Sequence, residues 1–174
     1  MGSRDIARLS LLIALALALY TLESLLPRPL PWLRLGLSNA LVLAALLIYG
    51  LRLALVVSVS RTLLGSLLIG SFLGPGFVLS ISAGVVSCVA MGTASFLGRK
   101  ALGTTGISVF GALAHNFTQL GLAYLLFIRR LEIFMLTPLF LLLSVGTGIV
   151  TGVAAHFLCQ RAGSALCHCG LGKE

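Results

Sequence analysis

Apolar residues fill six long segments of the chain, and short breaks rich in glycine, proline or arginine separate them. An α-helix needs about 20 apolar residues to cross a bilayer core of about 30 Å. Because the apolar runs do not alternate with polar positions, they favour helices over a membrane β-barrel. The second segment is short and bounded by glycines. The segments lie at about residues 6–26, 35–49, 53–71, 77–97, 105–128 and 134–158.

The sequence therefore predicts an all-α integral membrane protein with a single bundle of six transmembrane helices and a short cytoplasmic tail, residues 159–174. Composition supports this class. Hydrophobic residues make up 59% of the chain and charged residues only 9%, whereas soluble domains have about 25% charged residues. The net charge of +8 does not require a nucleic acid as partner, because basic residues at helix ends contact lipid headgroups.

Basic residues are unequally divided between the two sets of loops, which predicts the orientation of the chain. With the N-terminus inside, seven basic residues lie on the cytoplasmic side and four outside, and Arg61 lies within a span. The cytoplasmic set is Arg4, Arg8, Arg52, Arg99, Lys100, Arg161 and Lys173. The outer set is Arg28, Arg34, Arg129 and Arg130. We therefore expect both termini in the cytoplasm.

Two of the polar residues within the spans are predicted to lie near the middle of the membrane. Arg61 is nine residues past Arg52, or about 14 Å into the third helix. His115 is ten residues past Thr105 on the fifth helix, which runs in the same direction. An ionised arginine at this depth must face a partner or a wet cavity, and it is a functional-site hypothesis by default.

Further polar residues extend this hypothesis. On the fifth helix, His115, Asn116 and Gln119 fall within an arc of about 100°. Glu23 and Asn39 lie near the outer ends of the first and second helices. We predict a polar cavity, open to the outside, that binds a small anionic or polar solute. Arg61 would anchor its charge, Glu23 would balance Arg61 in the empty site, and the other four residues would orient the solute.

A structural role is the alternative for the same residues. Arg61 could pair with Glu23 or with helix carbonyls and hold the bundle together. Imidazole and amide groups such as those of His115, Asn116 and Gln119 often bond across membrane helices.

Small residues recur at four-residue spacing on two helices. Ser10, Ala14 and Ala18 form one stripe on the first helix. Ser144, Gly148 and Gly152 form another on the sixth. Such stripes let helices approach closely, so each is either internal packing or a docking face for another membrane protein. We assign Ser10, Ala14 and Ala18 as candidate docking residues.

Cysteine and histidine residues gather near the C-terminus, where thiolates and imidazoles could bind zinc. Their spacing matches no strong zinc pattern, and the cytosol is reducing. We therefore expect free thiols, no metal and no cofactor. The residues concerned are His156, Cys159, Cys167, His168 and Cys169.

Two long runs of the sequence resemble a known family. The runs "LGLSNALVLAALLIYGLRLALVVSVSRTLLGSLLIGSFLGPGFVLSISAG" and "GISVFGALAHNFTQL" are similar to a small bacterial membrane family, heptaprenyl diphosphate synthase component I, also called the Gx transporter family. The resemblance covers most of residues 6–158 and includes Arg61 and the polar residues of 115–119. It implies a multi-pass protein of the bacterial cytoplasmic membrane.

That family is in turn similar to the S components of energy-coupling factor (ECF) transporters. Those are six-helix proteins with both termini cytoplasmic, and they bind vitamins or related solutes from outside. They dock on a transmembrane coupling subunit, which works with ATPases, through an alanine-xxx-alanine stripe on the first helix. Ala14 and Ala18 match this stripe.

The family names imply different functions. An enzyme that elongates isoprenoid chains needs aspartate-rich motifs to hold Mg²⁺ on diphosphates, whereas this chain has one aspartate and three scattered glutamates. It also lacks a Walker A motif, so we expect that it is not an enzyme.

Our primary hypothesis is an S-component-like solute-binding transport protein that a separate partner energises. One alternative is a non-catalytic membrane subunit of a heptaprenyl diphosphate synthase in quinone biosynthesis, bound to a soluble prenyl synthase. The other is a structural subunit of a larger membrane complex.

Overall fold

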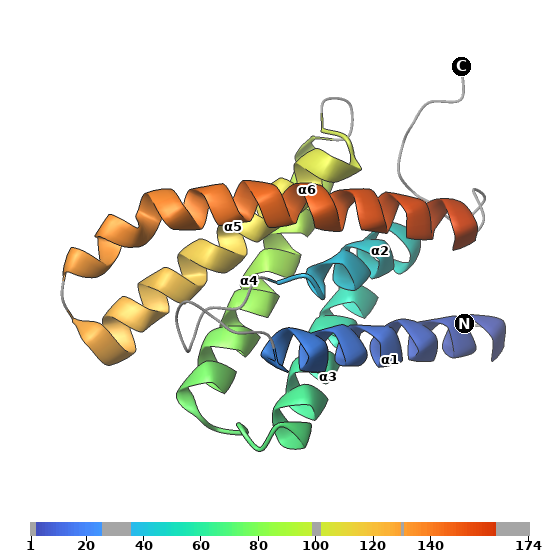
Figure 1. Cartoon of the computed structure of the whole chain (residues 1–174). Helices are drawn as coiled ribbons and strands as arrows, with labels where there is room; N and C mark the ends of the chain where they lie inside the picture. The colour runs from blue at the N-terminus through green and yellow to red at the C-terminus, as the bar shows by residue number, and fades with distance from the viewer. Residues whose placement is uncertain (1–2, 26–35, 99–101, 130, 163–174) are drawn as a thin grey trace.

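Helices account for every regular element in the part of the chain that the computed structural model describes, which is residues 3–25, 36–98, 102–129 and 131–162. These ranges contain six α-helices, and Figure 1 shows their arrangement. The helices are α1 (Ser3–Leu25), α2 (Asn39–Tyr49), α3 (Leu51–Leu68), α4 (Pro75–Leu97), α5 (Thr104–Ala123) and α6 (Thr137–Ala162). A π-helical turn (Tyr124–Ile128) and a 3-10 helix (Leu131–Leu136) lie between α5 and α6.

Four of the described helices are long and apolar enough to cross a membrane, namely α1, α3, α4 and α6. Large apolar side chains cover their outer surfaces. Leu22 on α1 is 59% exposed and Leu142 on α6 is 74% exposed, which suits lipid and would be costly in water. The described helices therefore indicate a membrane protein, as the composition predicts.

α2 is shorter than the sequence predicts. It has 11 residues and spans about 16 Å, roughly half the thickness of a bilayer core. The predicted helix over 35–49 starts too early, because residues 36–38 form a turn. Gly36 adopts φ 76°, a conformation that favours glycine, and its carbonyl oxygen accepts a hydrogen bond from Asn39 N at 2.9 Å.

α5 has 20 residues, but polar side chains interrupt its apolar sequence. The described ranges thus hold six α-helices, of which four meet the length and apolarity of a membrane span. That α2 and α5 complete a six-span bundle stays a prediction.

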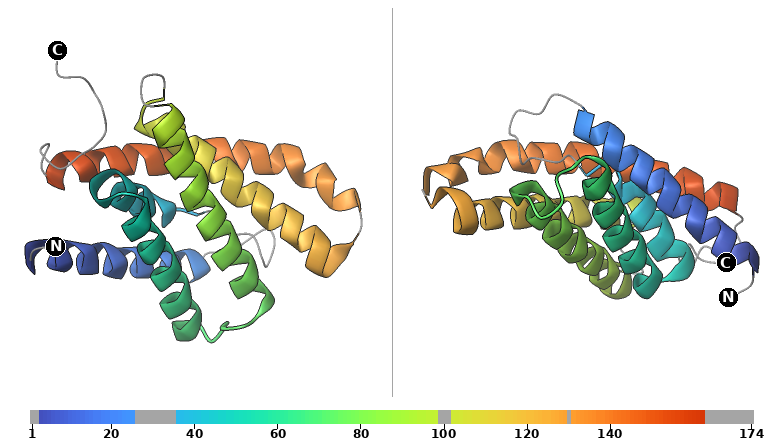
Figure 2. Two further views of the ribbon diagram at one scale, coloured as in Figure 1. Left: turned by 180° about the vertical axis from the view of Figure 1, so that it is seen from behind. Right: turned by 90° about the horizontal axis from the view of Figure 1, so that it is seen from below.

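α2 forms the centre of the bundle. Its residues from Asn39 to Leu47 are all buried, and it contacts each of the other five described α-helices. A helix that is apolar on all sides is buried in this way. α1 and α6 run in opposite directions on either side of it (Figures 1 and 2). α2 is therefore a short central helix that the other five α-helices surround.

α5 and α6 pack along each other as an antiparallel pair, as both views in Figure 2 show. Glycines permit the close contact. A Cβ atom at Gly148 would lie 2.6 Å from Val109 Cα, and one at Gly152 would lie 2.7 Å from Thr105 Cα. The stripe of Ser144, Gly148 and Gly152 is therefore internal packing, which confirms one of its two interpretations.

The predicted orientation can be tested with single cysteines at the first residues of α4 and directly before α5. Gly76 and Gly103 both have open space around the position of a Cβ atom, so Gly76→Cys and Gly103→Cys should fold normally. We expect an impermeant thiol reagent outside intact cells to label the first variant and not the second, because the positive-inside rule places Gly103 in the cytoplasm. The native cysteines are replaced first. Labelling of Gly103→Cys alone would show that the orientation is the reverse of the predicted one.

Candidate functional site

Arg61 is a buried arginine on α3 whose guanidinium joins α3 to the start of α2. Its side chain is 3% exposed. Nη1 donates a hydrogen bond to Ser38 Oγ, and Nη2 donates one to Asn39 Oδ1. Because the two acceptors are adjacent residues, the planar guanidinium binds both at once, as its fork geometry allows.

A glycine on α4 leaves room for this guanidinium. A Cβ atom at Gly84 would lie 2.9 Å from Ser58 Oγ and 3.8 Å from Arg61 Nη2. A side chain at position 84 would crowd Ser58 and would touch the guanidinium of Arg61. The charge is thus enclosed by α2, α3 and α4.

Glu23 supplies a negative charge to the same region. This residue, near the end of α1, is 5% exposed, and its Oε1 accepts a hydrogen bond from the Gly36 amide. The turn that begins at Gly36 leads into α2, so the carboxylate lies close to the positive end of that helix, where an anion is favourable. Glu23 and Asn39 thus both bond to Gly36, while the predicted role of Glu23 as the counter-charge of Arg61 stays a prediction.

His115 on α5 also lies close to this turn. The position of a Cβ atom at Gly36 lies 3.5 Å from His115 Cδ2 and 2.9 Å from Asn39 Nδ2. His115 Nε2 also lies 3.1 Å from Gln119 Nε2, one turn along α5. We call the whole group the polar cluster. Its members are Glu23, Gly36, Ser38, Asn39, Arg61, His115 and Gln119.

Asn116 does not join the polar cluster. Its Nδ2 donates a hydrogen bond to Ser144 Oγ on α6 at 2.7 Å, and its buried Oδ1 has no hydrogen-bond partner among the described residues. The expected common face of His115, Asn116 and Gln119 is therefore split. Asn116 fastens α5 to α6, whereas His115 and Gln119 interact with each other.

Sequence reasoning missed Gly36 and Ser38. A signal for both was present, because a glycine followed by serine and asparagine before an apolar run is typical of a turn entering a helix. That the polar cluster encloses a cavity for a solute stays a prediction.

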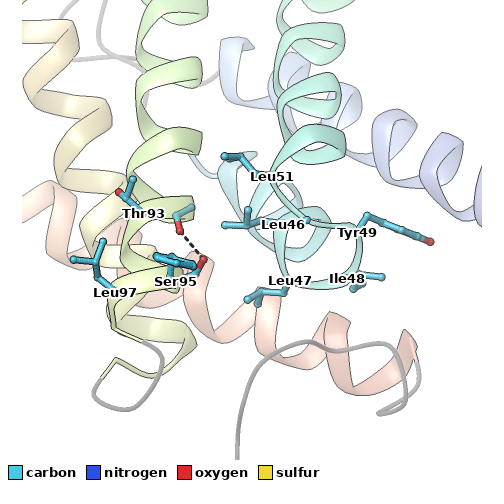
Figure 3. Close-up of a pocket in the computed structure, with 11 residues that line it drawn as sticks. Leu46, Leu47, Ile48, Tyr49, Leu51, Thr93, Ser95 and Leu97 are labelled. Atoms are coloured by element: carbon cyan, nitrogen blue, oxygen red, sulfur yellow. Dashed lines mark hydrogen bonds between the residues drawn. The ribbon is translucent and has the colours of Figure 1, made fainter.

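The structure does show a pocket of about 700 Å³ at the opposite end of α2. Its lining comes from residues 46–49 at the end of α2, from Gly50 and Leu51, and from residues 92–93 and 95–97 on α4. Figure 3 shows leucines of α2 and α3 on one side of the pocket and Ser95 and Leu97 of α4 on the other. The lining is mostly apolar, with hydroxyl groups on Tyr49, Thr93 and Ser95.

The small-residue stripe on α1 is open to the surroundings. Ser10, Ala14 and Ala18 are all exposed, in contrast to the buried stripe of α6. Internal packing within one chain is therefore wrong as an account of the α1 stripe. Lipid or another protein must cover it.

The C-terminal cysteines and histidines lie partly outside the described residues. Residues 167–169 are among those, while His156 interacts with Gln160 at 2.9 Å between their Nε2 atoms and Cys159 is buried. No group of three or more potential metal ligands comes together within the described ranges.

Comparison with known families gives one match. The family model described as heptaprenyl diphosphate synthase component I matches residues 12–158. This range includes α2 to α5 entire and every member of the polar cluster. No curated protein and no solved structure matches the chain.

Proposed function

Because the chain belongs to the heptaprenyl diphosphate synthase component I family, we propose that it is the membrane subunit of a heptaprenyl diphosphate synthase and works with a separate catalytic subunit. The family match carries this proposal, and it favours what the sequence analysis gave as an alternative to solute transport. Component I is the non-catalytic subunit, which agrees with the expectation that this chain is not an enzyme by itself.

The distribution of acidic residues supports a non-catalytic role. Elongation of a prenyl chain requires Mg²⁺ on diphosphate groups, held by clustered carboxylates. The chain contains only Asp5, Glu23, Glu132 and Glu174 as acidic residues. Glu23 bonds to Gly36 inside the polar cluster, so it is engaged in the structure. The reaction must therefore take place on the partner.

The chemistry of the product supports a membrane location for this subunit. A heptaprenyl chain is a long hydrocarbon, and each buried CH₂ group favours the membrane by about 0.8 kcal/mol. The diphosphate head keeps one end of the product at the water interface. A membrane subunit beside the catalytic partner would let the growing chain pass from the enzyme into lipid.

Co-expression with the catalytic prenyl synthase component tests the proposal. We expect the two to co-purify and the long-chain product to leave the enzyme faster in the presence of this chain. The variant Ala14→Leu with Ala18→Leu should leave this association intact, because both residues are exposed within the predicted membrane span of α1, where we do not expect a soluble enzyme to reach. Val150→Leu, at an exposed position of α6, is the matched control for the added leucine side chains.

One outcome of the double variant and one of the wild-type protein would change this picture. If it loses the prenyl synthase, the stripe is part of that interface and the synthase must reach into the membrane. If wild-type protein retains no synthase at all, the proposed function is wrong.

Solute binding is a second candidate function, and the polar cluster is the observation that favours it. A buried guanidinium lies at the positive end of α2, and both features attract an anion. In this alternative Arg61 binds an anionic solute, and the exposed stripe of α1 docks on a transmembrane coupling subunit. The double leucine variant would then abolish binding to that membrane partner, because added bulk prevents close approach of helices.

A further inference from the structure

The pocket between the end of α2 and the end of α4 has the form of a site for a hydrocarbon chain. Leucines of α2 and the start of α3 form one wall. Phe96 and Leu97 on the last turn of α4 form the other, and they are 78% and 83% exposed. A volume of about 700 Å³ falls within the range of about 300–1,000 Å³ that is usual for ligand pockets.

Gly92 shapes this pocket. A Cβ atom at Gly92 would lie 2.9 Å from Leu51 Cδ1, so the glycine lets α4 approach the beginning of α3 at the base of the pocket. Ser95 lies on the α4 side of the pocket (Figure 3). Its hydroxyl already donates to the Gly92 carbonyl oxygen at 2.7 Å. The polar group is therefore satisfied, and the remaining lining is suited to an apolar occupant.

A basic residue is next in sequence to the apolar lining. Arg52 follows Leu51 in α3 and is exposed. The pocket lies at the turn between α2 and α3, which the basic residues predict to be at the cytoplasmic surface. An apolar pocket at the membrane surface, with an exposed arginine one residue from its lining, is complementary to a molecule with a long hydrocarbon chain and an anionic head.

We propose that this pocket binds a polyprenyl diphosphate, with the prenyl chain against the leucines of α2 and α3 and the diphosphate near Arg52. The inference rests on the proposed function, because the synthase reaction supplies this amphiphile on the cytoplasmic side. An anionic phospholipid shares the same chemistry of chain and phosphate. Selectivity for the prenyl chain must therefore be part of the test.

Binding of heptaprenyl diphosphate to the purified full chain in detergent provides that test. Ser95→Trp fills the pocket from a half-buried position, so we expect retention of heptaprenyl diphosphate to fall at least about tenfold. Val86→Trp is the matched control, because it places the same side chain on an exposed position of α4 outside the pocket. Its binding should stay within about twofold of the wild type.

Arg52→Gln tests the head group without changing the apolar walls. Arg52 is exposed, so this variant should fold normally. We expect it to bind heptaprenyl diphosphate several-fold more weakly and neutral heptaprenol as the wild type does. This variant decides the question if the melting temperature shows that Ser95→Trp does not fold.

Two results would overturn the proposal. One is equal retention of heptaprenyl diphosphate by the folded pocket variants and the wild type. The other is its displacement by an equimolar amount of phosphatidylglycerol, which would make the pocket a general lipid site. Co-purification with the prenyl synthase is measured on the same variants. If the wild type co-purifies with the synthase but does not bind heptaprenyl diphosphate, this inference alone is wrong. If the wild type does not co-purify with the synthase, the proposed function is wrong.

Discussion

Arg61→Ala is expected to lower the free energy of unfolding of the purified protein by about 3 kcal/mol or more. The reason is that hydrogen bonds to charged groups contribute about 1.5–3 kcal/mol each. The substitution removes the donors to Ser38 and Asn39. Both acceptors are buried at the start of α2, where the helices leave them little access to water. The melting temperature in detergent, measured by circular dichroism, gives the loss.

Arg61→Lys should recover only part of this loss. The two hydrogen bonds of Arg61 come from separate nitrogens, Nη1 and Nη2, and a lysine ends in one compact ammonium group on a different stem. Arg52→Gln is the control for removal of an arginine from α3. Because Arg52 is exposed, its replacement should change the stability by no more than about 0.5 kcal/mol.

A second measurement on the same variants separates structure from binding at the polar cluster. Mass spectrometry identifies small molecules released from the purified wild type and from Arg61→Ala and Arg61→Lys. A lower melting temperature with unchanged released molecules means that Arg61 holds the bundle together. A compound that the wild type carries and a folded Arg61 variant lacks would favour the solute-binding candidate. An unchanged melting temperature in Arg61→Ala would contradict the structural role.

Gly148→Ala should destabilise the protein and Gly146→Ala should not, although the two positions lie two residues apart on α6. A Cβ atom at Gly148 would lie 2.6 Å from Val109 Cα, so α5 and α6 must separate. Overpacking of this kind costs about 1–3 kcal/mol. Nothing lies within 4 Å of a Cβ atom at Gly146, and alanine is better than glycine in a helix by roughly 0.5–1 kcal/mol. Gly146→Ala should therefore be neutral or stabilising.

Thermal unfolding of the two variants in the same detergent checks this prediction. An equal rise of the melting temperature in both variants would contradict the close contact between α5 and α6. Destabilisation by Gly146→Ala would instead contradict the open space around that position. The pair of substitutions also controls for helix propensity, since the residue introduced is the same.

The positions of the helices follow from the sequence, because the length of an apolar run and its glycine or proline boundaries are local properties. α4 ends at Leu97, where the predicted fourth segment ends. Depth in the membrane also follows from counting residues along a helix of known rise. This is why Arg61 and His115, on different helices, are predicted to lie at a similar depth. Arg61 bonds to Asn39, and His115 Cδ2 lies 3.5 Å from the position of a Cβ atom at Gly36, while a shared solute site stays a prediction.

The partners of individual polar groups depend on tertiary structure. His115 and Asn116 are adjacent in the chain, yet one lies beside Gly36 and the other bonds to Ser144 on α6. An arc on a helix can be calculated from the sequence. The sequence does not show which neighbouring helix occupies each part of that arc, because this depends on how all the helices pack.

The two small-residue stripes show the same division most clearly. Each has small residues at four-residue spacing, so the sequence by itself determined that α1 and α6 each have a face that permits close approach. Only the tertiary structure decided that Gly148 and Gly152 meet α5 while Ala14 and Ala18 face outward. The reason is physical. A glycine or alanine specifies how close a neighbour can come, whereas the neighbour itself is selected by the packing of the complete bundle around α2.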